Sequence, residues 1–311
     1  MGQINIIFGV FFLSLTLASI SANRFCDKTK CPGPTSYYKD LGCEPVYKNP
    51  NDCCPYKYNC DKVKSRSPNK CYANGHEYNI GEMLREEDSN PCDVQCRCLR
   101  LGGRAKFMCA VIDCPFFHVA DPNCYLPRKA NECCPGQPIC LRNPEDRPKC
   151  FVDGKIYRDG EEFIPKSEPH KKCICGPGYK GENIAPFCRV PLASSCRYEF
   201  RHADDIANNC TPTYYHRQSP QSDCSVGFRC QNKNDFVVKH IRNFLAPQAA
   251  DDMVCQFGTL TMRYGDELVQ NTGYESVCMR CVCEVGPVPT CIQLSNEECD
   301  VTNHPKFDYS Y

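Results

Sequence analysis

The stretch NECCPGQPIC, residues 131–140, places two cysteines side by side at Cys133 and Cys134. A disulfide between adjacent cysteines is strained by the small ring that it closes, so each of them must bond elsewhere or bind another group. A near copy, NDCCPYKYNC, occupies residues 51–60. The repeated cysteine pair predicts several small modules of related sequence along one chain.

The cysteine content indicates where such a chain is found. The sequence has 311 residues and 30 cysteines, which is typical of a disulfide scaffold if secreted and of metal or redox sites if cytosolic. The run INIIFGVFFLSLTLASISA, residues 4–22, is apolar with small residues near its end. It predicts a signal peptide over residues 1–22, cleaved near Ser21 or Ala22. A membrane anchor is the alternative, but the run is short for a spanning helix. We therefore expect a secreted, extracellular chain with no membrane span.

Composition and motifs limit the classes of function. The formal net charge of +0 gives no electrostatic case for nucleic acid. The sequence contains no Gly-x-Ser-x-Gly, His-Glu-x-x-His or phosphate-loop motif, so we expect no enzyme and no cofactor. The Cys-x-Cys and Cys-x2-Cys spacings are compatible with zinc. None of the seven His lies in a His-x3–5-His arrangement, and even cysteine counts favour disulfides over a metal site.

A second repeat marks the start of each module. CYANGHEYNIGEML from Cys71 and CFVDGKIYRDGEEF from Cys150 both read Cys-x3-Gly-x2-Tyr-x2-Gly-Glu-x-hydrophobic, and CQFGTLTMRYGDEL from Cys255 is a looser copy. Asn74-Gly75 and Asp153-Gly154 are strong two-residue turn signals, so we expect each module to open with a hairpin. The fold class expected is an elongated array of small disulfide-rich modules, made mostly of short antiparallel β hairpins and irregular loops.

The cysteine spacing divides the mature chain into four segments with 6, 10, 8 and 6 cysteines. Since every count is even, we expect the disulfides to close within each segment. The segments expected are an isolated second half at 23–61, a complete module at 71–140, a thinned module at 150–230 and an isolated first half at 255–299, before a tail at 300–311.

The connection between the last two segments, residues 231–254, carries a helical pattern. NDFVVKHIRNFLAPQ places Val237, Ile241, Phe244 and Leu245 on one helical face before Pro247. We expect a helix near residues 235–246, the only substantial helix of the chain. Its apolar face is expected to pack on a neighbouring module, with binding to a partner as the alternative.

One disulfide follows from hairpin geometry. QCRCLRLGGRAKFMC, residues 95–109, reads as a hairpin with Gly102-Gly103 as its turn. Opposed residue numbers then sum to 205, and Cys96 faces Cys109 in a non-hydrogen-bonded pair. The short Cα spacing of such a pair lies in the range that a disulfide requires.

The spacing as a whole resembles the von Willebrand factor type C module of chordin-like proteins. The resemblance rests on CDVQCRC at 92–98, on the Cys133-Cys134-Pro135 sequence and on the opening Gly-Tyr-Gly pattern. The tryptophan that usually follows this pattern is replaced by Leu84, Phe163 and Leu268. The family pairing implies Cys71–Cys98, Cys92–Cys133, Cys96–Cys109, Cys114–Cys134 and Cys124–Cys140, of which the third is also predicted by the hairpin register.

The thinned module lacks the second and eighth cysteines, which bond each other in the family pattern. The resemblance then implies Cys150–Cys175, Cys173–Cys188, Cys196–Cys224 and Cys210–Cys230. In the half modules it implies Cys31–Cys54, Cys43–Cys60, Cys255–Cys283 and Cys281–Cys291. Two leftover pairs, Cys26–Cys53 and Cys278–Cys299, are hypotheses.

The resemblance also implies a function. Proteins with these repeats often bind cystine-knot growth factors of the transforming growth factor β and bone morphogenetic protein type, and so modulate their signalling. The contact residues expected in the complete module are Tyr78, Ile80, Met83 and Leu84, although the same side chains are also candidates for its small core. The alternative is a structural protein of the extracellular matrix or of a secreted fluid, such as a host-defence or venom component.

Two further sites are suggested by local sequence. Arg97, Arg100, Arg104 and Lys106 lie on one hairpin and are candidates to bind heparan sulfate, although charges that protect a solvated strand edge are the simpler interpretation. Asn209-Cys210-Thr211 is an acceptor sequence for N-glycosylation at Asn209. A disulfide at Cys210 is expected to hinder that modification.

Overall fold

The computed structural model describes residues 26–115, 121–192, 196–239, 252–269, 278–295 and 297–299. The expected signal peptide and the tail after residue 300 lie outside these ranges. The described residues form small antiparallel strand pairs and a few short helices cross-linked by fifteen disulfides, which confirms a fold of small, disulfide-rich, mainly β modules. The terminal segments share one core, instead of standing at the two ends of the expected elongated array. None of the described helices is long and apolar enough to cross a membrane.

Six two-stranded sheets form most of the modules. They pair β1 (Glu44–Val46) with β2 (Lys57–Asn59), β3 (Lys70–Ala73) with β4 (His76–Asn79), β5 (Val94–Leu101) with β6 (Arg104–Ala110), β7 (Cys124–Tyr125) with β8 (Ile139–Cys140), β9 (Lys149–Val152) with β10 (Lys155–Arg158), and β17 (Val254–Phe257) with β18 (Leu260–Arg263).

Two larger sheets complete the strands. One has the order β11 (Glu162–Phe163), β12 (Lys172–Ile174), β13 (Cys188–Arg189). The other has the order β15 (Gly227–Arg229), β14 (Thr211–Tyr214), β21 (Thr290–Gln293), β20 (Met279–Val282), β19 (Glu267–Leu268), β16 (Val237–Val238). In this sheet β14 and β21 are parallel, which joins residues nearly 80 positions apart in sequence, such as Thr213 and Cys291.

The helices are short. The α-helices are α1 (Thr35–Asp40), α2 (Asp61–Lys64), α3 (Tyr198–Arg201) and α4 (Ala203–Ala207). The 3-10 helices are η1 (Lys28–Lys30), η2 (Glu86–Asp88) and η3 (Pro144–Asp146). Helices of this length are not stable alone in water, so packing must hold them in place.

The prediction of a helix near residues 235–246 is wrong for residues 235–239, which the structure describes. Val237 and Val238 form strand β16 and pair with Leu268 and Glu267 of β19. The nearby Asp235 is buried in an ion pair with Arg229, which fixes the approach of the chain to this sheet edge. Residues 240–251, which include the rest of the expected helix, lie outside the described ranges.

The opening repeat has the same backbone arrangement three times. Its two-residue turns close β3–β4, β9–β10 and β17–β18, and both Asn74 and Asp153 adopt positive φ in the turn, as expected. After each hairpin, the motif glycine donates its N–H to a cysteine carbonyl. The three donor–acceptor distances are 2.8 Å each, for Gly81 to Cys98, Gly160 to Cys175 and Gly265 to Cys283.

The acidic residue after each of these glycines closes the turn. Its carboxylate accepts a hydrogen bond from the backbone N–H three residues earlier. The pairs are Glu82 with Asn79 at 2.7 Å, Glu161 with Arg158 at 2.8 Å and Asp266 with Arg263 at 2.8 Å. The Gly-Glu part of the motif is thus explained by local backbone geometry, and it requires no ligand.

All thirty cysteines are joined in disulfides, and their pairs are the fifteen expected from the sequence, including Cys26–Cys53 and Cys278–Cys299. Equivalent bridges have similar Cα–Cα distances in each repeat. The distance is 5.8 Å for Cys71–Cys98, 5.8 Å for Cys150–Cys175 and 5.7 Å for Cys255–Cys283. Cys133 bonds the distant Cys92, whereas Cys134 bonds Cys114, so the adjacent pair links two parts of the chain.

The β5–β6 hairpin follows the expected register near its turn. Arg97 pairs with Met108, and Leu101 pairs with Arg104. The register shifts by one residue between Val94 and Arg97, where Gln95 adopts positive φ. The Cys96–Cys109 bridge lies at this irregularity, with its Cα atoms 3.9 Å apart.

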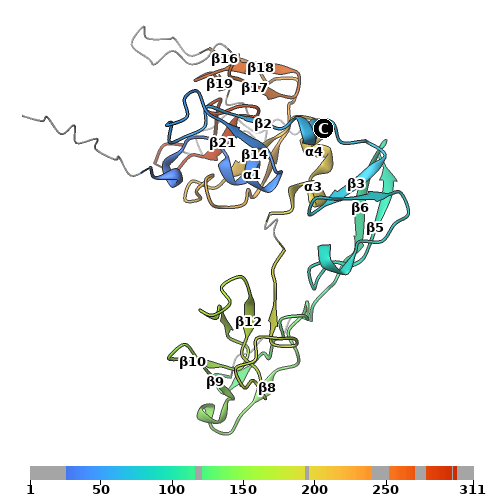
Figure 1. The fold of residues 1–311 in the computed structure, drawn as a ribbon, viewed down its shortest axis with the longest axis vertical. Coiled ribbons are helices and arrows are strands. Elements are labelled where there is room, and N and C mark those ends of the chain that lie inside the picture. Colours follow the sequence, from blue (N-terminus) through green and yellow to red (C-terminus); the bar gives the residue numbers. More distant parts are fainter. Residues whose placement is uncertain are drawn as a thin grey trace, which may run out of the picture.

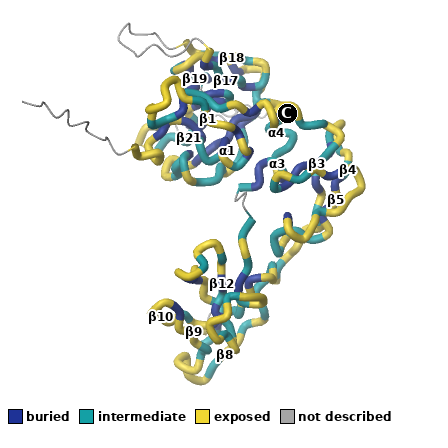
Figure 2. Tube along the Cα trace, in the orientation of Figure 1, coloured by how far each residue is buried: buried dark blue, intermediate teal, exposed yellow. Residues whose placement is uncertain are grey.

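The buried cores combine segments that are distant in sequence. The core of the hairpins at 71–107 includes Phe200 of α3, whose ring centroid lies 5.0 Å from that of Phe107. The core around α1 includes Tyr198 and Val285. In Figure 2 the buried residues are concentrated where the N-terminal, middle and C-terminal segments meet.

The two terminal segments lie side by side in the upper part of Figure 1. The buried hydroxyl of Tyr38 is 2.7 Å from the carbonyl oxygen of Val285 and accepts a hydrogen bond from the N–H of Val288 at 3.1 Å. Gly33, at φ +83°, approaches Val285 so closely that a Cβ at this position would lie 2.8 Å from the Val285 Cβ. The isolated second half at the N-terminus therefore packs directly on the isolated first half at the C-terminus.

A separate lobe in the lower part of Figure 1 contains β7 to β13. There Tyr125 donates a hydrogen bond to the buried carboxylate of Asp159 at 2.8 Å, and the Arg147 guanidinium lies 4.2 Å from the Tyr125 ring centroid. The second half of one expected module thus packs on the first half of the next. The Cys92–Cys133 bridge links this lobe to the hairpins above it.

We predict that the Cys92–Cys133 bridge can be removed without changing the other pairs. Replacing both residues with alanine should lower the free energy of unfolding by about 2–4 kcal/mol. The other fourteen disulfides should form, since the thinned module at 150–230 lacks this bridge and still closes its own. Non-reducing peptide mapping and chemical unfolding measure both effects.

The matched control removes Cys71 and Cys98, which are buried at 2% and 0% exposure. This variant should lose more stability, because it also leaves a cavity in the hairpin core. Rearranged pairs in the Cys92 and Cys133 variant would contradict the expected independence.

The contact between the chain termini gives a second prediction. Tyr38→Phe should lower the free energy of unfolding by about 1–3 kcal/mol, because buried backbone groups of Val285 and Val288 lose a hydrogen-bond partner. Tyr47→Phe is the control, since Tyr47 is 37% exposed. Equal effects of the two substitutions in chemical unfolding would show that the Tyr38 contact is not formed.

Candidate binding surfaces

The contact residues expected in the complete module divide into buried and exposed positions. Tyr78 is 1% exposed and its hydroxyl donates a hydrogen bond to Asp88, so the expectation that it contacts a partner is wrong. Strand alternation points this side chain into the core, against Phe107. Leu84 is partly buried against the same core. Ile80 and Met83 remain accessible, at 45% and 43% exposure.

Burial and hydrogen bonds together determine the ionisation of Tyr78 and Asp88. Burial, together with the hydrogen bond to Asp88, raises the pKa of Tyr78 to about 12. Burial opposes ionisation of Asp88, but hydrogen bonds from Tyr78 and His76 outweigh it and lower the pKa of that carboxyl. The pair therefore consists of a neutral phenol and a carboxylate at physiological pH, and it supports the hairpin from inside.

The outer face of the β5–β6 hairpin has a short row of accessible side chains. Met83 forms an isolated bridge to Arg97, and Arg97 pairs in turn with Met108, so these three side chains share one face. Met108 is 48% exposed. The Arg97 guanidinium donates a hydrogen bond to the carbonyl of Gly81 at 2.8 Å, which holds it along the row.

The four cations proposed for heparan sulfate are not equivalent. Arg97 is held by Gly81, and Lys106 forms an ion pair with Asp204 of α4 at 2.7 Å. Arg100 is exposed on β5 and Arg104 lies at the start of β6. The charge available to a polyanion at these four positions is thus reduced by one internal ion pair.

A more exposed apolar pair lies on the β9–β10 hairpin. Phe151 and Ile156 are directly opposed across the two strands, at 73% and 65% exposure. The equivalent pairs elsewhere are Tyr72 with Glu77 and Gln256 with Thr261, so this feature belongs to one hairpin. Sequence analysis missed it, although alternation from the buried Cys150 places Phe151 on the outer face.

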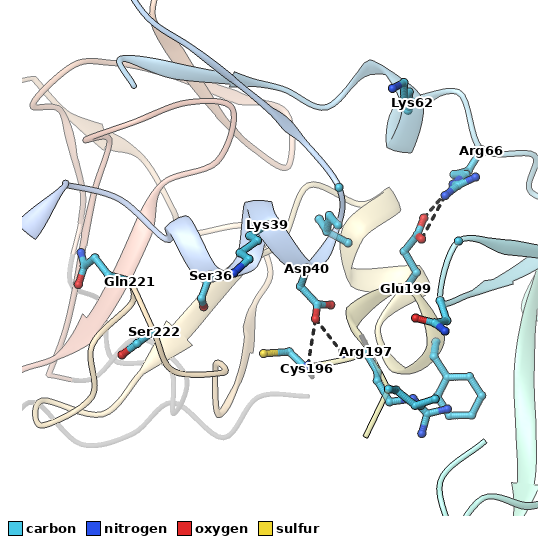
Figure 3. A pocket seen from close by; sticks show the side chains of 16 residues that line it. Ser36, Lys39, Asp40, Lys62, Arg66, Cys196, Arg197, Glu199, Gln221 and Ser222 are labelled. Atoms are coloured by element: carbon cyan, nitrogen blue, oxygen red, sulfur yellow. Dashed lines mark hydrogen bonds and ion pairs between the residues drawn. The ribbon is translucent and has the colours of Figure 1, made fainter. Parts of the chain in front are cut away.

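A hollow of about 700 Å³ lies where α1, α3 and the 61–75 segment meet (Figure 3). The Asp40 carboxylate accepts hydrogen bonds from the backbone N–H groups of Cys196 and Tyr198, at 3.0 and 3.1 Å. Glu199 accepts two hydrogen bonds from Arg66, at 2.8 and 3.2 Å. Asp40, Arg66 and Glu199 are therefore already bound within the protein, and the hollow is a junction between segments.

Arg197 strengthens the same junction. Its guanidinium lies 3.9 Å from the Phe200 ring centroid and forms an ion pair with Asp93. Burial lowers the pKa of Arg197, and the negative charge of Asp93 opposes that shift. The pair is inaccessible to a ligand, with side-chain exposures of 4% and 8%.

Potential metal-ligand groups occur only as disulfide clusters among the described residues. Three groups bring three candidate atoms within 4.8 Å of one another, and each contains a bonded cysteine pair. Metal binding requires a thiolate, which a disulfide sulfur does not offer. The groups are Cys31 with Cys53 and Cys54, Cys114 with Cys133 and Cys134, and Asp205 with Cys210 and Cys230.

The acceptor sequence for glycosylation lies at a contact between segments. The Asn209 side chain donates to the carbonyl of Gly258 at 3.4 Å. Thr211 is fully buried, and its hydroxyl donates to the carbonyl of Pro289. A glycan at Asn209 would compete with this contact in the folded protein.

No family model matches the chain, and no solved structure matches it. The arguments about function therefore rest on the residues and on the sequence resemblance.

Proposed function

We propose that this protein is a secreted, extracellular binding protein of the von Willebrand factor type C kind, which binds growth factors of the transforming growth factor β and bone morphogenetic protein type and modulates their signalling. Fifteen disulfides and no free cysteine are typical of proteins from oxidising compartments. The ligand class comes from the sequence resemblance. The observation that supports a binding role is the exposed Phe151–Ile156 pair.

The solvent-exposed side chains of Phe151 and Ile156 are suited to contact another protein. Large apolar side chains dominate the energetics of protein interfaces, and burial contributes about 25 cal/mol per Å² of apolar surface. The β9–β10 sheet has only two strands, so its edges also offer backbone groups to a partner strand. The disulfide Cys150–Cys175 fixes this hairpin, which reduces the entropy lost on binding.

Two exposed apolar pairs of the same lobe should differ in their effect on growth-factor binding. The oxidised mature protein should bind at least one immobilised growth-factor dimer of this type saturably, and reduction with alkylation should abolish binding. Phe151→Ser with Ile156→Ser should weaken binding about tenfold or more, as loss of a central contact does. The control, Ile184→Ser with Val190→Ser, removes side chains of 58% and 59% exposure outside the hairpin and should change affinity less than about twofold.

Peptide mapping of each variant should show unchanged disulfides, which separates binding from folding. Equal affinity of the hairpin variant and the unmodified protein would contradict the assigned surface. Failure of the fully oxidised protein to bind any dimer would contradict the growth-factor proposal and favour the structural alternative.

A further inference from the structure

A second cavity lies between the hairpins at 70–107 and helix α4. Its volume is about 420 Å³, within the range of roughly 300–1,000 Å³ that small-molecule sites occupy. Most of the residues that line it belong to the 63–72 segment, β6 and α4, and Glu199, Asn209 and Gln256 complete the lining. We refer to it as the basic pocket, because of the charges described below.

The floor of the basic pocket is apolar. Ala105 and Phe107 are nearly buried, at 2% and 9% exposure, and Val63 closes one side. The neighbouring Tyr72 ring is covered by the Arg66 guanidinium, which lies 4.2 Å from the ring centroid. On the opposite wall, α4 contributes Ala203, Ile206 and Ala207, of which the first and last are small. An apolar or aromatic group of modest size would therefore replace water in the cavity with a favourable change in free energy.

The rim of the pocket is strongly cationic. It includes one acidic residue, Glu199. Its five basic residues are Lys64, Arg66, Lys70, Arg104 and Lys106. Ion pairs join Arg66 to Glu199, Lys70 to Glu77 and Lys106 to Asp204. In the ranges described by the structure, Lys64 and Arg104 have no acidic partner at ion-pair distance. Three of the five cations are thus paired, with Glu199, Glu77 and Asp204. The other two can bind an anionic group.

We propose that the basic pocket binds a small amphiphilic anion, with one carboxylate or sulfonate headgroup at Lys64 and Arg104 and a compact apolar body against Val63, Phe107 and Ile206. A guanidinium is well suited to such a headgroup because it donates two parallel hydrogen bonds. A linear polyanion such as heparan sulfate fits less well, because it would leave the apolar floor empty. The proposal is independent of the growth-factor proposal, whose surface lies in another lobe.

The test measures binding of 8-anilinonaphthalene-1-sulfonate to the oxidised mature protein by fluorescence, and its displacement by decanoate. Decanol, with a similar body and no charge, should displace the probe at least about tenfold less well, because charge-assisted hydrogen bonds are lost. Lys64→Glu with Arg104→Glu should weaken probe binding about tenfold or more. Arg100→Glu is the control on the adjacent strand: Arg100 pairs with Ala105 but does not line the pocket, and its replacement should have less than about a twofold effect.

A second variant tests the cavity without changing its charge. Ala207 is exposed on α4, so Ala207→Trp should preserve the fold and fill the pocket, and probe binding should be lost. Equal displacement by decanol and decanoate would overturn the role of the headgroup. Unchanged binding by Ala207→Trp, equal effects of the Arg100 and Arg104 variants, or displacement by heparin fragments but not by decanoate would each overturn the assignment.

Discussion

A short disulfide-bonded segment has few apolar side chains to bury, and in this chain most segments complete their cores with side chains from another segment. Phe200 enters the core of the hairpins at 71–107, and Val285 enters the core around α1. Only the core at 150–188 is built from its own segment among the described residues. This constraint explains why the chain does not form a row of independent modules, and why its polar junctions, such as Asp40 with α3, occur between segments.

The local part of this structure could be predicted from sequence. Two-residue turns and strand alternation are local signals, and they indicate the hairpins and the Cys96–Cys109 bridge. The other disulfide pairs of the structure agree with those that the family resemblance implies and with the two leftover pairs. The prediction of a helix is wrong at Val237 because this residue pairs with Leu268, a partner that no local pattern reveals. Tyr78, which is expected as a contact residue and is also a candidate for the core, belongs to the core, where its ring packs against Phe107.

Local sequence signals also indicate only a part of each binding surface. Arg104 and Lys106 are recognisable as a cationic pair from sequence, but the basic pocket also needs the 63–72 segment and α4, which lies about a hundred residues after β6 in the chain. The exposed Phe151–Ile156 pair was accessible to sequence reasoning, because the alternation in β9 is regular. Its distinctiveness emerges only from comparison of three hairpins that share one backbone and differ on their outer faces. The disulfides thus fix a common frame on which exposed side chains vary.

The N-terminal and C-terminal half modules pack together in one molecule, and this contact can be tested chemically. Lys57 forms an ion pair with Asp252, which lies 195 residues later in sequence. A carbodiimide joins such pairs directly, so treatment of the dilute oxidised protein followed by peptide mapping should recover a Lys57–Asp252 link from the monomer. The local pair Lys70–Glu77 provides the positive control. Recovery of the control link without the Lys57–Asp252 link, or of the latter only from dimers, would contradict the account.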